Sequence, residues 1–180
     1  MTKQKELSVL FSAGGTGGHV VPCAVLYRYL KKHARRTVIT DQTHWFAESS
    51  GIFASPYLKR TRSIFKSIVV LTKERLAIIK EQKPTHIICF GSLYCMPSFL
   101  AFLIWRLQGH SCKLLLHEQN AILGRMHQLM QYFASTIFTA FPTVQKISPL
   151  CTRKVVMVGT PTRSAPQLSL IHISEPTRPY

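Results

Sequence analysis

The sequence predicts an α/β fold, a doubly wound parallel sheet with helices on both faces, on three observations. Short apolar runs of strand length alternate with longer segments of helical spacing along most of the 180 residues. Strands as apolar as these are typical of a parallel sheet with helices on both faces. A glycine-rich turn joins the first apolar run to the first helical segment. Because ligands in such folds bind beyond the carboxyl ends of the strands, we expect a site at this turn.

Six strands and four helices are expected along the chain. The predicted strands are Leu7–Phe11, Arg36–Thr40, His86–Phe90, Lys113–Leu116, Thr136–Ala140 and Val155–Val158. The predicted helices are Val21–His33, Ser63–Lys83, Pro97–Leu107 and Gly124–Phe133. Ser63 can cap the start of the second helix, and Pro84 stops it because proline cannot continue the helical hydrogen-bond pattern.

The composition is strongly basic, with 23 Lys and Arg residues against 7 Asp and Glu residues and a formal net charge of +16. A field of that sign attracts nucleic acid, an anionic membrane or phosphorylated substrates. The chain has no recognisable nucleic-acid motif and its aromatic residues lie in apolar runs, so a basic nucleic-acid-binding module is the weaker alternative. Five cysteines, an odd number without a C-x-x-C pair, predict buried reduced thiols and no metal site.

No membrane-spanning or targeting segment is expected. The N-terminus enters a strand-like run directly and lacks the longer apolar core of a signal peptide. The longest uninterrupted apolar stretch, Phe99–Trp105, is far shorter than the ~20 residues that a membrane-spanning helix needs. The sequence therefore predicts a protein that can touch a membrane without crossing it.

The run Gly14–His19 reads GGTGGH and predicts a phosphate-binding turn. Glycines let backbone N–H groups approach a ligand closely, and the start of the following helix favours negative charge. The Walker A pattern is excluded because His19 and Val20 follow the last glycine, and the G-x-G-x-x-G pattern fails because its third glycine would be Val20. The alternative is a tight turn without a ligand.

The predicted helix Ser63–Lys83 is basic on one side. Lys66, Lys73 and Lys80 recur every seven residues, and apolar residues from Ile64 and Phe65 onward are expected on the other side. The stretch Lys59–Lys83 holds eight basic residues, Arg75 among them, and two acidic ones. This helix either has an ordinary solvated face or rests on an anionic leaflet through Arg62, Lys66 and Lys73.

Three later loops follow strand ends. Gly91 and Ser92 open a second turn, His117–Asn120 (HEQN) is a dense polar cluster, and Gly159–Arg163 (GTPTR) follows the last strand. Side chains of this kind at a strand's carboxyl end are typical of a sugar or nucleotide site. The alternative for Asn120 is a helix cap.

GGTGGH, HEQN and GTPTR, in this order and spacing over residues 7–163, resemble the MurG family, the membrane-associated N-acetylglucosaminyltransferases that convert lipid I to lipid II in peptidoglycan synthesis. The resemblance implies a GT-B-type glycosyltransferase with two Rossmann-like halves, of which residues 1–163 form the N-terminal, acceptor-binding and membrane-facing domain. The C-terminal donor domain would be missing, so this chain alone is expected to be inactive. Residues 164–180 would be a truncated end, and Leu168–Tyr180 is expected to be non-native.

The resemblance also assigns site residues. His19 matches the proposed general base, and Glu118 belongs to the HEQN box and is a second candidate for catalysis. Gly14, Gly15, Gly91 and Ser92 would form the phosphate and acceptor loops. The positions that match the binding of UDP-N-acetylglucosamine are Thr16, Gly17, Gly18, Asn120 and Arg163.

Two departures from the family pattern bear on these assignments. The second loop reads GSLYCMP where the family has a sequence like GGYVSGP, so Ser92 and Met96 stand in glycine positions and weaken the expectation of a close backbone approach. GTPTR replaces the family's GNPVR, with Thr160 in place of an amide and Arg163 retained.

The resemblance implies three partners, UDP-N-acetylglucosamine, lipid I and an anionic membrane surface, and no nucleic acid. It implies inverting transfer without a cofactor or metal, at the cytoplasmic face of the bacterial inner membrane. The runner-up is another GT-B nucleotide-sugar transferase with a soluble acceptor.

Overall fold

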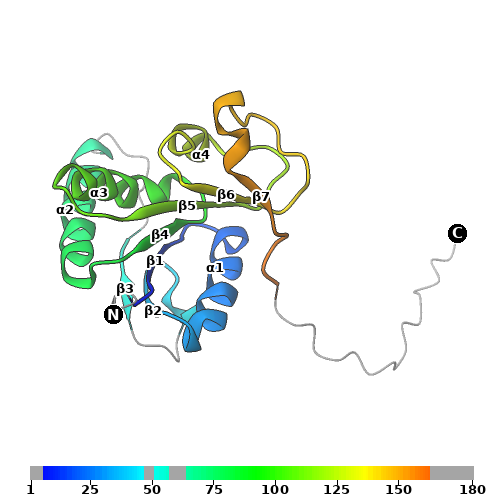
Figure 1. Ribbon diagram of the computed structural model, residues 1–180. Helices are drawn as coiled ribbons and strands as arrows, with labels where there is room; N and C mark the ends of the chain where they lie inside the picture. The colour runs from blue at the N-terminus through cyan, green and yellow to red at the C-terminus, as the bar shows by residue number, and fades with distance from the viewer. Residues whose placement is uncertain (1–5, 47–50, 57–63, 163–180) are drawn as a thin grey trace, which may run out of the picture.

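The computed structural model describes residues 6–46, 51–56 and 64–162. Seven parallel strands form one sheet in the order β3-β2-β1-β4-β5-β6-β7 (Figure 1). The strands are β1 (Ser8–Ser12), β2 (Arg35–Thr40), β3 (Ile52–Ala54), β4 (His86–Cys89), β5 (Lys113–Glu118), β6 (Thr136–Thr139) and β7 (Val155–Met157). The predicted fold class is confirmed, and so are all six predicted strands.

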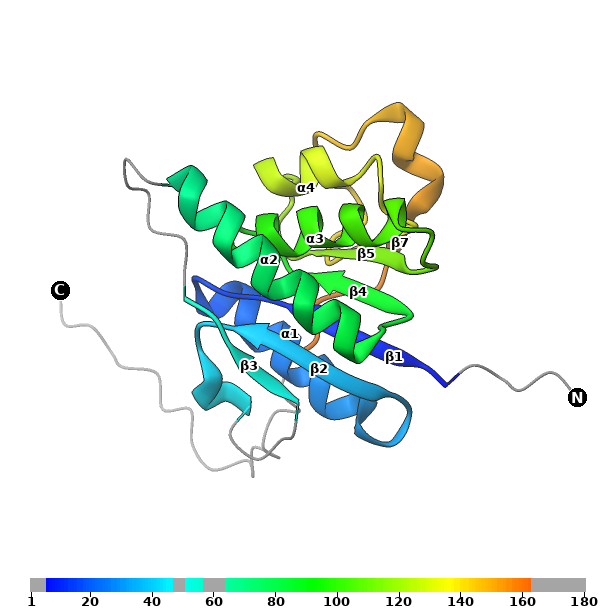
Figure 2. The ribbon, with the colours of Figure 1, turned by 90° about the vertical axis from the view of Figure 1, so that its left-hand side faces the viewer.

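The helices form two layers. They are α1 (Gly17–Tyr29), α2 (Ile64–Gln82), α3 (Met96–Leu107) and α4 (Arg125–Met130). The helix α1 covers one face of the sheet, while α2, α3 and α4 cover the other, with α2 and α3 side by side (Figure 2). Short 3₁₀ turns at Leu30–Lys32, Thr43–Phe46, Leu93–Cys95 and Pro149–Lys154 complete the connections.

Alternation along the strands divides the core in two. Leu10 of β1 packs with the α2 and α3 side, whereas its neighbours Val9 and Phe11 pack with α1. All of these side chains are buried, as expected for a parallel sheet covered on both faces. The five cysteines are buried and free, which confirms the prediction of buried reduced thiols.

Several predicted boundaries were wrong. The helix α1 begins at Gly17, four residues before the prediction, and α4 ends at Met130, three residues before it. The strand β5 continues through His117 and Glu118, which places half of the HEQN cluster within the sheet. The edge strand β3 was not predicted, because three residues are too few for a periodic signal.

The helix α2 differs from the predicted division into a basic and an apolar side. Arg75 is fully buried: its guanidinium lies 4.3 Å from the centre of the Tyr94 ring and donates hydrogen bonds to the Tyr94 carbonyl and the Ser98 hydroxyl. Burial lowers the pKa of Arg75. Phe65, expected on the buried side, is instead 80% exposed.

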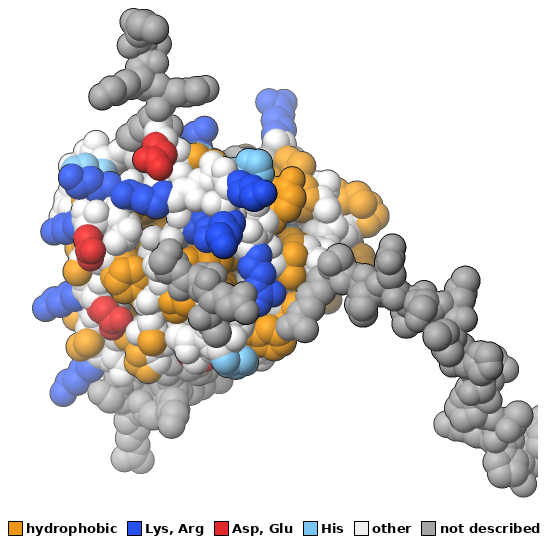
Figure 3. Space-filling view, turned by 90° about the horizontal axis from the view of Figure 1, so that it is seen from below, with side chains coloured by type: hydrophobic (Ala, Val, Ile, Leu, Met, Phe, Trp, Pro, Cys, Tyr) orange, Lys and Arg blue, Asp and Glu red, His pale blue; other side chains and the backbone are white. Residues whose placement is uncertain are grey.

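Lys and Arg side chains are spread over the surface seen from below, with few acidic side chains between them (Figure 3). No helix among the described residues combines the length and the apolar character needed to cross a bilayer.

Candidate functional site

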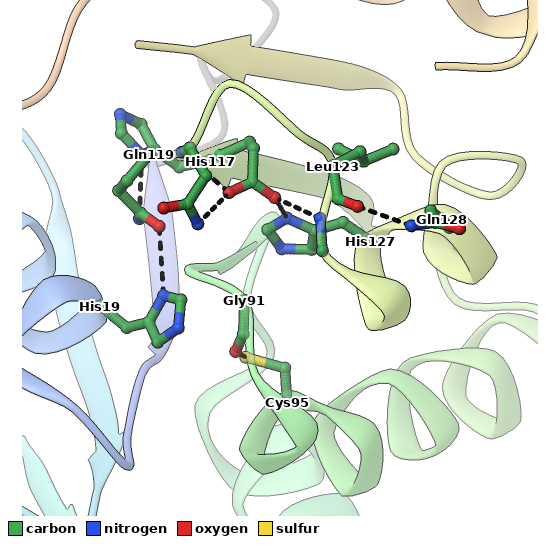
Figure 4. A network of polar contacts seen from close by, with 11 residues as sticks. His19, Gly91, Cys95, His117, Gln119, Leu123, His127 and Gln128 are labelled. Carbon is green, nitrogen blue, oxygen red and sulfur yellow. Dashed lines mark hydrogen bonds and ion pairs between the residues drawn. The ribbon is translucent and has the colours of Figure 1, made fainter. Parts of the chain in front are cut away.

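The candidate site lies where β1, β4 and β5 end. The loop after β1 leads into α1, the loop after β4 leads into α3, and the chain after β5 leads toward α4. Because these strands are neighbours in the sheet, their three carboxyl-end loops lie beside one another (Figure 4).

The first glycine loop is closely packed at Gly14. A Cβ atom there would lie 2.6 Å from the Tyr94 ring and 2.7 Å from Oδ1 of Asp41. The backbone N–H of Gly15 donates to both carboxylate oxygens of Asp41, at 3.1 and 3.2 Å. This part of the loop therefore holds a side chain of the protein itself, where the sequence predicted a phosphate.

The second half of the loop is open. Thr16 is the N-cap residue of α1, its side chain makes no capping bond, and Thr16, Gly17 and Gly18 are all exposed. A Cβ atom on Gly17 would meet nothing within 4 Å. A ligand can approach the first amides of α1 here, which is the usual place for an anion.

The loop after β4 has an unusual backbone at its first two residues. Gly91 has a φ of 92° and Ser92 a φ of 62°, so the serine adopts the left-handed backbone that favours glycine. The Ser92 hydroxyl donates to the Gly14 carbonyl and accepts from the Tyr94 N–H, both at 3.2 Å. Ser92 thus joins the two loops directly.

Glu118 is buried and accepts four hydrogen bonds. Its Oε1 accepts from the backbone N–H and the side-chain amide of Asn120, and its Oε2 accepts from the Gly124 N–H and from Nδ1 of His127 at 3.0 Å. Burial alone would raise the pKa of Glu118. The hydrogen bond and the charge of His127, together with the hydrogen bonds from the backbone N–H groups of Gly124 and Asn120, instead lower this pKa to about 2. The carboxylate therefore holds the loop between β5 and α4 in place.

Asn120 does not cap a helix. The N-cap residue of α4 is Gly124, whose N–H is bonded to Glu118, so that alternative was wrong. The Asn120 residue is exposed at the edge of the site.

A second chain of hydrogen bonds runs from His117 to His19. Nε2 of His117 lies 3.3 Å from the Gly159 carbonyl, and its Nδ1 lies 3.2 Å from Nε2 of Gln119. Oε1 of Gln119 in turn lies 3.1 Å from Nδ1 of His19 (Figure 4). Successive side chains of a strand point to opposite faces, so His117 faces the α1 side while Glu118 faces α4.

A cavity of about 700 Å³ opens beside His19. Its polar lining comes from His19, Gly91, Ser92, Glu118, Asn120, Gly124 and Arg125, and its apolar lining from Ile64, Leu93 and Met126. A cavity of this size, lined by both polar and apolar residues, suits a ligand of several linked groups.

The structure gathers part of the predicted site. His19, Gly91, Ser92, Glu118 and Asn120 line the cavity together. Lys66 and Lys73 are exposed on α2 and do not line it. Arg62 and Arg163 lie outside the described residues.

Asp41, Arg125 and His127 were not predicted as site residues, and His117 and Gln119 were predicted only as members of the HEQN cluster, without roles of their own. For Asp41 a signal existed, because it is a polar residue directly after β2. Gln119 belongs to the HEQN cluster, but its role depends on which strands are neighbours.

Comparisons with known proteins agree with the motif resemblance. The model of the glycosyltransferase family 28 N-terminal domain matches residues 9–139. A curated protein of Bradyrhizobium sp. strain BTAi1 is 31% identical over 92% of this chain and 47% of its own length, and one of Anaplasma marginale is 32% identical over 86% and 45%. Both are named UDP-N-acetylglucosamine--N-acetylmuramyl-(pentapeptide) pyrophosphoryl-undecaprenol N-acetylglucosamine transferase.

Solved structures support the fold. The crystal structure of Acinetobacter baumannii MurG has a TM-score of 0.68 at 22% identity, covering 88% of this chain and 46% of that one. A UDP-N-acetylglucosamine 2-epimerase from Rickettsia bellii has a TM-score of 0.59 at 11% identity, covering 87% and 45%. The chain spans about half the length of the curated relatives it matches.

Proposed function

This chain belongs to glycosyltransferase family 28, and we propose that it is the acceptor-binding half of an inverting transferase that moves N-acetylglucosamine from UDP-N-acetylglucosamine to lipid I. The domain would extend over residues 1–163, with the donor-binding half supplied by a C-terminal domain. The observation that carries the proposal is the position of His19 at the first turn of α1, beside a cavity with polar and apolar walls.

In the proposed reaction His19 is the general base. It takes the proton from the 4-hydroxyl of the acceptor sugar as that oxygen attacks the anomeric carbon of the donor. The bond from the anomeric carbon to the UDP oxygen breaks, and UDP leaves with its electron pair. One displacement inverts the configuration at the anomeric carbon.

The pyrophosphate would be held without a metal by the protein's own groups. The exposed start of α1 at Thr16, Gly17 and Gly18 supports this assignment, since its N–H groups and helix dipole favour an anion. Asn120 and Arg163 are the side chains proposed to complete the donor contacts. Gly15 is not included, because Asp41 already accepts from its N–H.

The cavity walls support an acceptor with both polar and apolar parts. Arg125 offers a cation to the acceptor pyrophosphate, while Ile64, Leu93 and Met126 offer apolar contact to its lipid portion. Because Ile64 is the first residue of α2, the cavity adjoins the N-terminal end of α2, the helix proposed to face the membrane.

Attachment to the cytoplasmic face of the membrane is proposed to use α2. Phe65, Val69 and Val70 are 80%, 54% and 62% exposed, and Lys66 and Lys73 are exposed on the same helix. Exposed apolar residues beside lysines are typical of a helix that rests on an anionic leaflet.

The test is transfer of radiolabelled N-acetylglucosamine to a short-chain lipid I analogue. The chain alone is expected to give little or no product, and the chain joined to the C-terminal half of the Bradyrhizobium relative is expected to give lipid II analogue. His19→Ala should then reduce the rate by about 10²- to 10⁴-fold. Transfer only to a soluble acceptor would favour another GT-B enzyme, and tighter binding to oligonucleotides than to anionic vesicles would favour a nucleic-acid module.

A further inference from the structure

We propose that Gln119 and His117 are positioning residues that fix the tautomer of His19, with the hydrogen on Nδ1 and the lone pair on Nε2. The hydrogen-bond chain determines this arrangement by itself, and its catalytic meaning rests on the proposed role of His19 as general base.

The chain of bonds starts at a group that can only accept. The Gly159 carbonyl has no hydrogen, so Nε2 of His117, 3.3 Å away, has to donate to it. His117 is 2% exposed, and its burial lowers its pKa, which keeps the ring neutral at pH 7. A neutral imidazole with hydrogen on Nε2 carries its lone pair on Nδ1.

That lone pair orients the amide of Gln119. Nδ1 of His117 accepts a hydrogen bond, so the group 3.2 Å from it has to be the NH₂ of Gln119. The amide oxygen then points the other way and lies 3.1 Å from Nδ1 of His19. Because an amide oxygen can only accept, His19 has to donate from Nδ1.

The remaining nitrogen of His19 is thereby left as a base. Among the described residues, Nε2 of His19 has no hydrogen-bond partner, and the ring lines the cavity. With the opposite tautomer Nε2 would carry a hydrogen and could not take a proton from the acceptor hydroxyl. The Gln119 oxygen also stabilises the positive charge that His19 gains on accepting that proton.

His117, at the far end of this series of hydrogen bonds, is held in place by the sheet. The His117 ring stacks on Phe90 with centres 5.2 Å apart, and His117 is paired with Phe138 of β6. An amide flip of Gln119 would turn its oxygen toward the lone pair of His117 and its NH₂ toward His19. The packed position of His117 therefore sets the tautomer of a residue almost a hundred positions earlier in the chain.

The direct test is ¹⁵N–¹H correlation spectroscopy of the histidine-labelled 180-residue chain, which separates a protonated ring nitrogen from one with a lone pair. The expected result is an Nδ1–H tautomer for His19 and an Nε2–H tautomer for His117. An Nε2–H tautomer for His19 in the wild-type chain would overturn the proposal.

Variants separate positioning from folding. Gln119→Leu removes the acceptor, and His19 is expected to become a mixture of tautomers. Gln119→Glu keeps an acceptor for His19 but removes the donor to His117, so His19 should stay Nδ1–H while the His117 signals change. Gln128→Leu is the matched control, because Gln128 donates to the Leu123 carbonyl outside this chain of bonds and should leave His19 unchanged. A His19 spectrum that is unchanged in Gln119→Leu would contradict the proposal.

The two proposals fail separately. In the joined enzyme, Gln119→Leu is expected to lower kcat by roughly 10- to 100-fold, by analogy with the hydrogen-bond partners of metal-ligating histidines, with little change in the donor KM and rescue by Gln119→Glu. The expected tautomers without any transfer would overturn the proposed function alone. Transfer activity together with a mixture of His19 tautomers in the wild-type chain would overturn only the proposed role of Gln119.

Discussion

The carboxylate of Asp41 lies against the backbone N–H of Gly15, with its two oxygens at 3.1 and 3.2 Å. An acidic side chain from the end of β2 therefore occupies one of the amides that a glycine loop offers to anions. The protein uses the first half of this loop for its own folding and leaves the second half, at the start of α1, exposed.

Removing the Asp41 carboxylate should destabilise the fold. Asp41→Ala is expected to lower the free energy of unfolding by about 1.5–3 kcal/mol, the usual worth of hydrogen bonds to a charged group. Asp41→Asn keeps one amide oxygen for the Gly15 N–H and should lose less. Urea denaturation of both variants checks the order, and an Asp41→Ala variant as stable as wild type would show that the contact contributes nothing.

Gly14 and Gly17 should separate folding from binding. Gly14→Ala places a Cβ atom within 2.7 Å of the Tyr94 ring and Asp41, and is expected to cost about 1–3 kcal/mol of stability. Gly17→Ala meets no atom within 4 Å and should leave the melting temperature unchanged or slightly raised. In the joined enzyme, Gly17→Ala should instead raise the KM for the donor, because a methyl group narrows the approach to the α1 amides.

Ser92 combines an unfavourable backbone with two useful hydrogen bonds. Ser92→Ala keeps the φ of 62° and loses both bonds, so it should destabilise by about 1–2 kcal/mol. Ser92→Gly loses the same bonds but relieves the backbone strain, and should be more stable than the alanine variant. Thermal unfolding compares the stabilities of the two variants. If Ser92→Ala is at least as stable as Ser92→Gly, the backbone of Ser92 is not strained.

Glu118 should make stability depend on acid pH. Its folded-state pKa of about 2 lies below its ordinary value of 4.5, so its contribution is complete above about pH 4.5 and is lost as the pH falls toward 2. Glu118→Gln places an NH₂ group among four donors and should cost about 2 kcal/mol or more at pH 7.

Urea titrations between pH 7 and pH 2.5 check this prediction. The difference between wild type and Glu118→Gln should shrink below pH 4.5. Glu81→Gln, at an exposed position of α2, is the control and should run parallel to wild type. A constant difference down to pH 2.5 would mean that Glu118 is not the titrating group.

Membrane binding should depend on the position of charge as well as on its amount. Lys66→Gln with Lys73→Gln is expected to weaken binding to anionic vesicles by roughly 10-fold or more, at about 1 kcal/mol per basic residue. Lys31→Gln with Lys32→Gln removes the same charge from another exposed site and should have less effect. Vesicle co-sedimentation at two salt concentrations compares the pairs, and equal losses would argue against a role of α2.

The pattern of apolar residues predicted the positions of strands and helices better than it predicted which side chains are buried. Six strands followed from apolar runs, because burial on both faces requires such runs. Arg75 was counted only among the basic residues of the stretch Lys59–Lys83, although it stands three and four residues from Leu71, Thr72, Ile78 and Ile79 and so shares their buried side. Helical spacing should outweigh charge where the two disagree.

The site was predicted as a set of loops without their connections. The HEQN cluster was correctly associated with a strand end, but the strand continues to Glu118, and alternation sends His117 and Glu118 to different partners. The contacts of Asp41 and Gln119 depend on the order of strands in the sheet, which is not a property of any local segment.

The contact between His19 and Gln119 spans 100 positions of the chain and three neighbouring strands. No hairpin or single helix can form it early, since β1, β4 and β5 have to pair first, and parallel pairing over such separations is intrinsically slow. During refolding, the contact between His19 and Gln119 is therefore expected to form only after these three strands have paired. A partly folded chain can therefore contain the glycine loop while His19 still lacks its partner Gln119.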